Sequence, residues 1–289
     1  MLCALSSIFA LGLAGGVVQN HSLAADPIVM NFHHDMPEDT AQHQGAVKFK
    51  ELVEQKTNGR IKVQVYANNA LGDDVAALQQ MQLGAIQGGV VPTAKLSNFD
   101  KAFQIPDLPF LFPNPAVAHK ALDSEVGSRI LGKLDAVGLK GTAFWESGFK
   151  QFICNHEVHE PADFTGRKVR VMESPLLIAQ YRALGANPIP IAFSETYTAL
   201  QQGVVECQEQ PIVTIAKMKF YEVQDYITLS NHGYLGMAQV FSKSWFDGLD
   251  GDLQQALIDA SLEAGAYQRE QSRIEYDRYL GEIAAAGST

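Results

Sequence analysis

The chain has 289 residues, of which 46% are hydrophobic and 19% are charged, and its formal net charge at pH 7 is −10. This length suits two average domains, and the composition is that of an ordinary globular protein, which excludes wholesale disorder. An acidic chain lacks the clustered basic surface on which nucleic-acid binding depends, so nucleic acid is excluded as the main partner. No internal repeat or low-complexity tract occurs, which excludes solenoids and propellers.

Residues 1–24 contain no Lys, Arg, Asp or Glu and end in small residues near Ala24. The apolar run is short and is interrupted by Gly12, Gly15 and Gly16, so it fits a secretory signal peptide better than a membrane-spanning helix. The positively charged start that signal peptides usually have is missing. We expect export with cleavage after Ala24, and a buried N-terminal helix is the alternative.

Two cysteines remain after this leader, Cys154 and Cys207. They could form one disulfide bond in an oxidising compartment, or remain two buried free thiols. The sequence looks the same in both cases, and free thiols are the interpretation that we favour.

Strand and helix patterns alternate along the first half of the chain. Strands are predicted at 28–32, 61–65 and 85–91, with helices between residues 39 and 58 and at about 74–83. Because strand, helix and strand follow one another, the pattern predicts a parallel or mixed sheet with crossover helices, an α/β architecture. The stretch 103–115 contains four prolines, so we expect an ordered connection there and not a strand.

The alternation continues in the second half. Helices are predicted near 117–136, at 175–184 and from Ser194 through Leu200, and strands at 138–145, 149–154, 168–172, 204–208, 226–230 and 236–241. One long helix is predicted from Gly251 to about Leu280, which makes it roughly 45 Å long at 1.5 Å per residue. One small domain does not need a helix of that length, so we expect it to lie across two domains.

Motifs of the common enzyme classes do not occur. The sequence has no nucleophile elbow, no phosphate-binding P-loop and no dinucleotide-binding glycine motif. His156 and His159 are three residues apart in a predicted loop, which does not match the helical H-E-x-x-H zinc motif. His33, His34 and Asp35 follow the first predicted strand, where ligand-facing loops occur, but adjacent strand residues point in different directions. We therefore expect no catalysis, no bound metal and no cofactor.

Two basic residues stand out because cations are few. Arg170 lies inside a predicted strand between Val169 and Val171, and Lys150 lies two residues after Gly148. An unpaired buried charge is very costly, so a cation with such neighbours is exposed at an edge or directed at something negative. On composition alone, anion binding and a structural ion pair stay open for both residues.

Several further motifs occur in a fixed order along the chain. They are F-K-E-L-V-E-Q-K-T-N-G-R at 49–60, L-G-D-D at 71–74, D-L-P-F-L-F at 107–112, A-L-G-A-N-P at 183–188 and, most specific, the run 193–211. In this order they resemble the substrate-binding proteins of TRAP (tripartite ATP-independent periplasmic) transporters over nearly the whole chain after the leader. G-F-K-Q at 148–151 and H-G-Y-L-G at 232–236 are similar to the C4-dicarboxylate branch.

The resemblance implies a two-lobed periplasmic binding protein fold of the α/β class, with hinge strands and a long lobe-spanning C-terminal helix. The implied division is a signal peptide at 1–24, lobe I at 25–147 plus 236–270, and lobe II at 148–235 plus 271–289. Family members usually continue for several more helices, so we expect the chain to be truncated at its C-terminus.

The ligand site of the family carries over residue by residue. The arginine that pairs with the ligand carboxylate corresponds to Arg170, the second cation to Lys150, and an aromatic ring of the cleft to Phe193. Gln210 stands where the family usually has asparagine, which is one methylene shorter, so ligand size or pose is in question. Further ligand contacts are expected from Trp145, His33, Thr93 and Glu173.

The implied function is that of an extracytoplasmic solute-binding protein that captures a small organic acid and delivers it to a TRAP permease. A C4-dicarboxylate is the favoured ligand, because two cations facing one cleft favour a dianion. The alternatives are another carboxylate (a monocarboxylate, a sugar acid or an amino acid) and a two-lobed sensor or enzyme of the same fold. A periplasmic monomer is expected.

Overall fold

The computed structural model describes residues 26–285, so the predicted signal peptide and its cleavage site lie outside the described residues. Eight strands form one mixed sheet in the order β2-β1-β3-β8-β4-β7-β5-β6. The strands are β1 (Ile28–His33), β2 (Ile61–Tyr66), β3 (Gly88–Pro92), β4 (Leu139–Cys154), β5 (Lys168–Val171), β6 (Asn187–Pro190), β7 (Cys207–Pro211) and β8 (Tyr226–Ser242).

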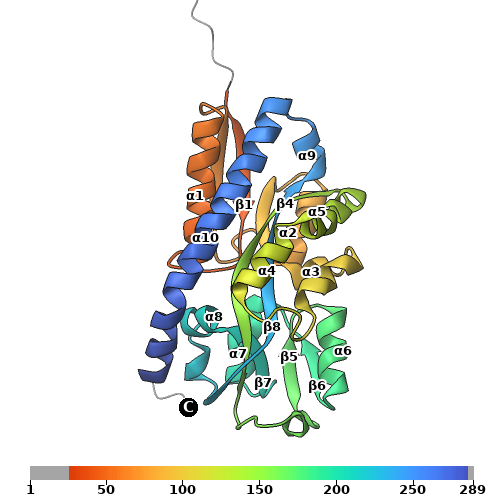
Figure 1. Ribbon diagram of the computed structural model, residues 1–289, viewed down its shortest axis with the longest axis vertical. Helices are drawn as coiled ribbons and strands as arrows, with labels where there is room; N and C mark the ends of the chain where they lie inside the picture. Colours follow the sequence, from red (N-terminus) through yellow and green to blue (C-terminus); the bar gives the residue numbers. More distant parts are fainter. Residues whose placement is uncertain (1–25, 286–289) are drawn as a thin grey trace, which may run out of the picture.

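Helices flank this sheet in both halves of the molecule (Figure 1). The α-helices are α1 (Ala41–Lys56), α2 (Asp74–Gln82), α3 (Thr93–Leu96), α4 (Pro115–Leu122), α5 (Glu125–Leu131), α6 (Pro175–Ala183), α7 (Thr196–Gln201), α8 (Ile212–Lys217), α9 (Lys243–Asp247) and α10 (Gly251–Ala285). Short 3₁₀ helices are η1 (Lys101–Asp107), η2 (Gly132–Val137), η3 (Pro161–Phe164), η4 (Phe193–Glu195) and η5 (Phe220–Glu222).

Strand pairing divides the sheet into two lobes. In lobe I, β3 pairs with the C-terminal part of β8, ending at Pro92 opposite Met237. In lobe II, β7 pairs with the C-terminal part of β4, beginning at Lys150 opposite Pro211. The strands β4 and β8 pair with each other in both lobes and therefore connect them, as the expected two-lobed α/β fold requires (Figure 1).

The hinge strand β4 differs from the prediction. The sequence pattern predicted two strands interrupted at residues 146–148, but β4 is continuous. Its register with β8 shifts between Glu146 and Gly148, and it also shifts once in each lobe. Gly148 has a φ of 117°, a conformation that side chains with a Cβ rarely adopt, so it accommodates the irregularity without breaking the strand. The two predicted strands at 226–230 and 236–241 are likewise one strand, β8.

Two short elements of lobe II were not predicted, and a third was misplaced. The strand β6 contains two prolines and lies at the edge of the sheet, where missing N–H donors are tolerated. The helix α8 has only six residues, too few to show a helical period. The strand β7 begins at Cys207 and not at residue 204.

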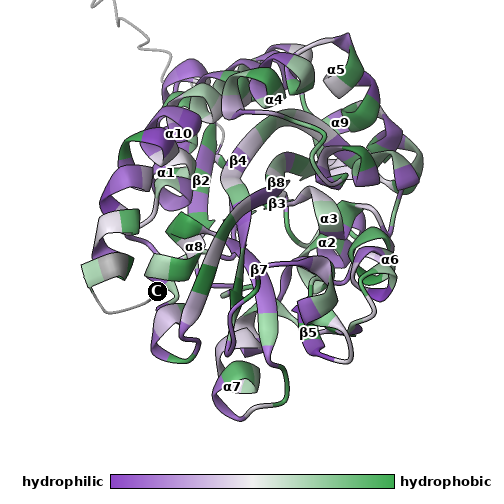
Figure 2. Cartoon of the chain, turned by 60° about the horizontal axis from the view of Figure 1, so that its bottom comes forward, coloured by the Kyte–Doolittle hydropathy of each residue, from purple (hydrophilic) through white to green (hydrophobic). Residues whose placement is uncertain are grey.

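The long helix α10 lies across both lobes, as predicted (Figure 1). Leu253 and Leu257 near its start are buried in the lobe I core, whereas Tyr279 and Ile283 near its end are buried in the lobe II core. Hydrophilic and hydrophobic residues both occur along α10, which agrees with a helix packed on one face (Figure 2). Within residues 26–285, no helix has the length and apolar character needed to cross a membrane.

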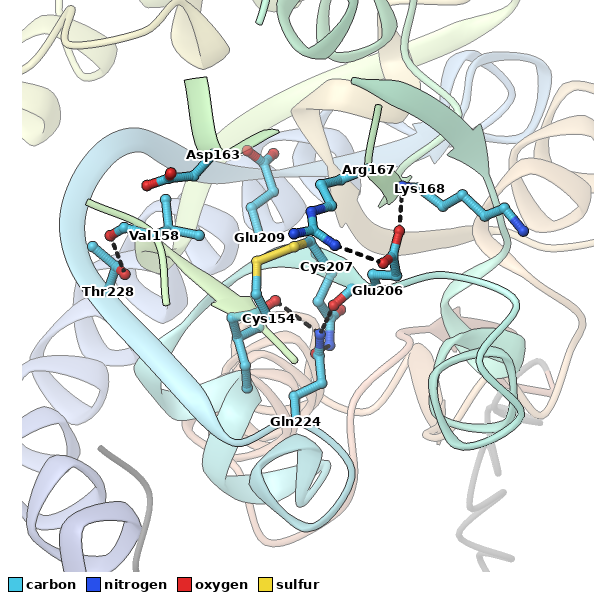
Figure 3. Close-up of a disulfide and its surroundings, with 12 residues drawn as sticks. Cys154, Val158, Asp163, Arg167, Lys168, Glu206, Cys207, Glu209, Gln224 and Thr228 are labelled. Atoms are coloured by element: carbon cyan, nitrogen blue, oxygen red, sulfur yellow. Dashed lines mark hydrogen bonds and ion pairs between the residues drawn. A yellow bond between two sulfur atoms is a disulfide. The ribbon is translucent and has the colours of Figure 1, made fainter. Parts of the chain in front are cut away.

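Cys154 and Cys207 form a disulfide bond, so the expectation of free thiols is wrong (Figure 3). The two residues lie directly opposite each other on β4 and β7, with their Cα atoms 4.1 Å apart. This register was not visible in the sequence because the start of β7 was placed three residues too early. The disulfide fixes β7 to the hinge strand β4.

Candidate ligand-binding site

A small cavity of about 20 Å³ lies between the two lobes. A cavity of this size holds about one water-sized group, so an organic molecule enters only when the lobes move apart. Its lining combines Asp35, Met36, Gln42, Pro92 and Lys95 of lobe I, Ser147, Leu235 and Met237 of the hinge strands, and Met172, Phe193, Gln210 and Thr214 of lobe II.

The cavity lies where parallel strands of both lobes end. In lobe I, β1 and β3 run parallel side by side, and Asp35 and Lys95 follow their carboxyl ends. In lobe II, β5 runs parallel to β6 and β7, and Met172, Phe193 and Thr214 follow these three strands. Crevices at the carboxyl ends of parallel strands are the usual ligand sites of α/β sheets.

Arg170 is buried in β5, two residues before Met172, which follows the strand and lines the cavity. Arg170 itself is not among the lining residues of the closed cavity. Its Nε and Nη2 atoms both donate to the backbone oxygen of Ile191, at 3.0 and 2.9 Å. Within residues 26–285, Nη1 has no hydrogen-bond acceptor and no carboxylate lies within ion-pair distance of the guanidinium. Burial lowers the pKa of Arg170 to about 10, a value at which it still carries its charge near neutral pH.

Lys150 occupies a different environment. Its Nζ lies 2.7 Å from Glu209 Oε1 and 3.4 Å from Asp107 Oδ1, and all three side chains are buried. Burial would lower the pKa of Lys150, but these two carboxylates hold it above its ordinary value. Lys150 was expected to present a second cation to a ligand; in this structure its charge is compensated by Glu209 and Asp107, and its contact with a ligand remains a prediction.

His33 contributes to a buried polar network of lobe I and not to the cavity wall. Its Nε2 lies 3.0 Å from Asp74 Oδ1, and Lys95 Nζ lies 2.9 Å from the other carboxylate oxygen. Although burial raises the pKa of Asp74, Lys95 and His33 together lower it to about 2. The network holds Lys95 in place, so His33 positions a lining residue and does not line the cavity itself.

Thr93 and Trp145 also lie away from the cavity wall. Thr93 Oγ1 lies 2.9 Å from Asp107 Oδ2 and 3.0 Å from the backbone oxygen of Gly236, which links α3 to β8. The Trp145 ring is buried in the lobe I core, so close to Gly45 and Gly265 that a Cβ at either position would press on it. Trp145 was expected to contact a ligand; in this structure the hinge strand directs its ring toward α1 and α10 and away from the cavity wall.

The two lobes are closed on each other in this structure. Glu173 of lobe II reaches Lys95 of lobe I, with Oε2 and Nζ 3.6 Å apart, and its backbone oxygen accepts a hydrogen bond from Asn98 Nδ2. On another part of the rim, Lys217 Nζ of α8 lies 2.7 Å from Asp39 Oδ2. Glu173, expected as a ligand contact, therefore joins the lobes at the edge of the cavity.

A larger groove of about 1,120 Å³ lies between α10 and the loop that precedes α4. Both arginines of its lining are already paired, Arg269 with Asp123 through two contacts of 2.7 and 2.9 Å and Arg273 with Glu270 at 2.6 Å. Of the residues that follow the parallel strands, only Val213 after β7 is among its lining residues. The interlobe cavity is therefore the better candidate for a ligand site, despite its smaller volume in the closed state.

Phe193 and Gln210 line the cavity, and their contact with a ligand remains a prediction. Sequence reasoning missed several other lining residues. Asp35 and Lys95 could have been found from their positions just after two parallel strands. No local pattern marks Gln42, Ser147 or Thr214 as lining residues. Their position in the cavity wall depends on how α1, β4 and α8 pack together.

Two α/β lobes joined by hinge strands and closed over a cavity define the class of extracytoplasmic solute-binding proteins. The chain belongs to DctP, the bacterial extracellular solute-binding protein family 7, which matches residues 32–289. This assignment agrees with the resemblance to TRAP substrate-binding proteins that the sequence motifs indicated.

Three similar proteins illustrate the range of the family. The C4-dicarboxylate-binding periplasmic protein DctP of Rhodobacter capsulatus is 41% identical over 92% of this chain and 80% of its own length. The sugar acid binding protein DctPAm of Advenella mimigardefordensis, solved with galactonate, is 36% identical with a TM-score of 0.88, covering 91% of this chain and 85% of that one. A TRAP solute-binding protein of Shewanella oneidensis, solved with succinate, is 33% identical with a TM-score of 0.86. The match covers 90% of this chain and 85% of that one.

Proposed function

We propose that this protein captures a small organic acid outside the cytoplasm and delivers it to a TRAP permease, and that Arg170 binds the ligand carboxylate. A single observation carries the assignment of Arg170: it is a buried arginine with no carboxylate within ion-pair distance in residues 26–285, although Glu173 and Glu209 act on its charge from farther away. A structural ion pair, the alternative role, would leave a carboxylate beside the guanidinium. The Nε and Nη2 atoms of Arg170 donate to the backbone oxygen of Ile191, which fixes the guanidinium. Its Nη1 atom can then donate to the carboxylate of a bound ligand.

Closure of the lobes is the proposed mechanism of capture. The lobes meet at Glu173 and Lys95 and at Lys217 and Asp39, and β4 and β8 connect them. We place the lobe boundaries at 147/148 and 235/236, because the partner strands change on either side of these positions. Hinge motions of this kind are absorbed by a few residues at the ends of elements.

The proposed route outside the cytoplasm is export by the signal peptide at residues 1–24, with the mature protein in the periplasm. The disulfide between Cys154 and Cys207 supports this, because disulfides persist in oxidising compartments. We propose a binding role without catalysis, since none of the motifs supplies a nucleophile with an adjacent base.

Native mass spectrometry of the purified protein tests the function as a whole. We expect one small organic acid to co-purify with the protein, to be released intact on denaturation, and to rebind in a one-to-one ratio. Recovery of a chemically altered molecule after rebinding would favour the two-lobed enzyme, and a neutral ligand would contradict the carboxylate assignment.

A further inference from the structure

Three side chains that can ligate a metal lie together at the end of β4, away from the interlobe cavity. Cys154 and Cys207 are buried, and their sulfur atoms and a ring nitrogen of His156 all lie within 4.8 Å of one another. In the sequence, the candidate partner of His156 was His159, whereas the structure places two cysteines beside it. None of the three residues lines the cavity, so the proposed function gives this group no role.

The imidazole of His156 has a nitrogen without a partner. Its Nε2 atom is buried, and no hydrogen-bond partner reaches it within residues 26–285. The N–H of the preceding residue, Asn155, donates to the backbone oxygen of Glu206 at 3.0 Å, which holds this segment against the start of β7. Buried polar atoms are nearly always hydrogen-bonded, so one without a partner needs an explanation, of which ion binding is one.

The backbone holds the two cysteines together independently of the disulfide. Cys154 lies directly opposite Cys207 in the antiparallel pairing of β4 with β7. The side-chain amide of Gln224 donates to the backbone oxygens of Ile153 and Glu206, at 2.8 and 3.2 Å, and thereby connects the residues that precede the two cysteines (Figure 3). We therefore expect the two thiols of the reduced protein to stay adjacent.

Two thiolates and one imidazole are a ligand set for a borderline or soft metal ion such as Zn²⁺. Tetrahedral Zn²⁺ with bonds of about 2.3 Å to sulfur and about 2.0–2.1 Å to nitrogen places its ligand atoms roughly 3.5–3.8 Å apart. The three ligand atoms already lie within 4.8 Å, and the sulfur atoms need only separate once the S–S bond is broken. Two thiolates also balance the charge of a divalent ion, which a buried position favours.

We propose that the reduced protein binds one Zn²⁺ ion through Cys154, Cys207 and His156, and that formation of the disulfide excludes the metal. A thiol or phosphine reductant supplies the two electrons that break the S–S bond, and two protons complete the thiols. Zn²⁺ then replaces both thiol protons, which leave to solvent, while the neutral imidazole supplies an electron pair. The fourth position is left for water, as in zinc sites with three protein ligands.

This inference goes beyond the proposed function and does not depend on what the interlobe cavity binds. Every newly made chain passes through the reduced state before its disulfide forms. The metal and the disulfide use the same two sulfur atoms, so bound Zn²⁺ would also protect the thiols from oxidation until the ion is removed.

Metal titration of the reduced full chain tests the proposal. The protein is reduced with a phosphine, which has no thiol to compete for metal, and is then freed of reductant without oxygen. We expect one Zn²⁺ per chain in competition with a chromophoric chelator, and Co²⁺ should give thiolate charge-transfer absorption with the intense visible bands of a tetrahedral site. The oxidised protein should show neither, and equal Zn²⁺ binding by the oxidised protein would overturn the inference.

His156→Ala tests the ligand set while keeping both thiols. It should weaken Zn²⁺ binding about tenfold or more, since even the groups behind a metal ligand contribute about 10–100-fold. His159→Ala is the matched control, because His159 lies in the same segment and its side chain is 76% exposed. Unchanged affinity in His156→Ala would overturn the inference, and so would Zn²⁺ binding retained in the Cys154→Ala/Cys207→Ala double variant.

Near-ultraviolet circular dichroism shows whether the reduced protein keeps its fold. We expect the spectrum of the reduced, Zn²⁺-bound protein to match that of the oxidised protein, because strand pairing and Gln224 hold the site. Zn²⁺ binding by an unfolded chain alone would overturn the inference. Affinity for the co-purified acid is measured on the same samples, so absence of Zn²⁺ binding overturns this inference alone and absence of acid binding overturns the proposed function alone.

Discussion

The side-chain amide of Gln268 on α10 pairs with the backbone of Glu146 on the hinge strand β4. Gln268 Nε2 donates to the Glu146 oxygen at 2.7 Å, and its Oε1 accepts from the Glu146 N–H at 3.0 Å. The register of β4 with β8 shifts at this point, so the helix satisfies backbone groups where the sheet is irregular. Gln268 is buried, and the pair therefore anchors the middle of α10 to the hinge.

Replacing Gln268 by leucine should destabilise the protein by about 2 kcal/mol or more, because each unsatisfied buried polar group costs about 1–3 kcal/mol. Urea unfolding of the ligand-free protein measures this loss. Gln255→Leu on the same helix is the control, since Gln255 is exposed and, within residues 26–285, bonds only to Asp259. Equal losses in the two variants would show that the amide of Gln268 does not anchor the hinge.

Reduction of the disulfide should lower stability by about 4 kcal/mol at most. The bond closes a loop with a sequence separation of 53 residues, and the chain-entropy relation gives about 4 kcal/mol for that length. Thermal unfolding with and without dithiothreitol measures the effect, and the Cys154→Ala/Cys207→Ala double variant should not respond to the reductant. An unchanged melting temperature after complete reduction would contradict a stabilising role.

The ion pair between Lys95 and Glu173 should favour the closed state. Glu173→Gln removes one charge across the cavity rim, while Lys95 keeps Asp74 as its partner. A partly exposed pair is worth about 0.2–1 kcal/mol, so we expect a few-fold weaker ligand affinity and a larger radius of gyration without ligand.

Small-angle scattering of the free and ligand-saturated protein provides the measurement for Glu173→Gln. Wild type should become more compact with ligand, and the variant should need more ligand to do so. Glu157→Gln serves as the control because Glu157 is exposed and, among the described residues, pairs only with nearby His159. Indistinguishable profiles for free and saturated wild type would contradict closure itself.

The raised pKa of Asp35, about 7, predicts a pH dependence of stability. The folded protein holds a proton on this group that the unfolded chain releases near pH 4, so its contribution is fully present below pH 4 and is lost as pH rises through 7. Relative to wild type, Asp35→Asn should therefore gain about 2 kcal/mol of stability between pH 5 and 8. A pH-independent difference between the two proteins would show that Asp35 titrates normally.

The sequence predicted the α/β class, most elements of lobe I and the helix that spans the lobes, because long amphipathic segments and strand alternation are strong local signals. It missed the continuity of β4, since Glu146-Ser147-Gly148 has the composition of a loop, and nothing local indicates that Gln268 supports that stretch from α10. Contacts between segments more than a hundred residues apart leave no trace in a local pattern.

The residues of the candidate site also depend on contacts that the local sequence does not reveal. The resemblance assigned the ligand carboxylate to Arg170 and a second cation to Lys150, and from the residues alone an ion pair stayed open for both. Their difference comes from Glu209 and Asp107, which reach Lys150 from β7 and η1. Only the register of β7 on β4 and the position of η1 reveal that one cation is compensated and the other is not.

The most direct test of the central claim is the calorimetric affinity of Arg170→Ala for the acid that co-purifies with wild type, measured beside its melting temperature without ligand. Losing one partner of a buried charge pair costs about 2–5 kcal/mol, or roughly 30-fold to over 1,000-fold in affinity at 1.4 kcal/mol per tenfold. We expect that loss with a melting temperature within a few degrees of wild type, and no loss in Arg167→Ala, whose side chain lies half-exposed beside Glu206. A destabilised Arg170→Ala protein that still binds the acid tightly would contradict the claim that Arg170 binds the ligand carboxylate.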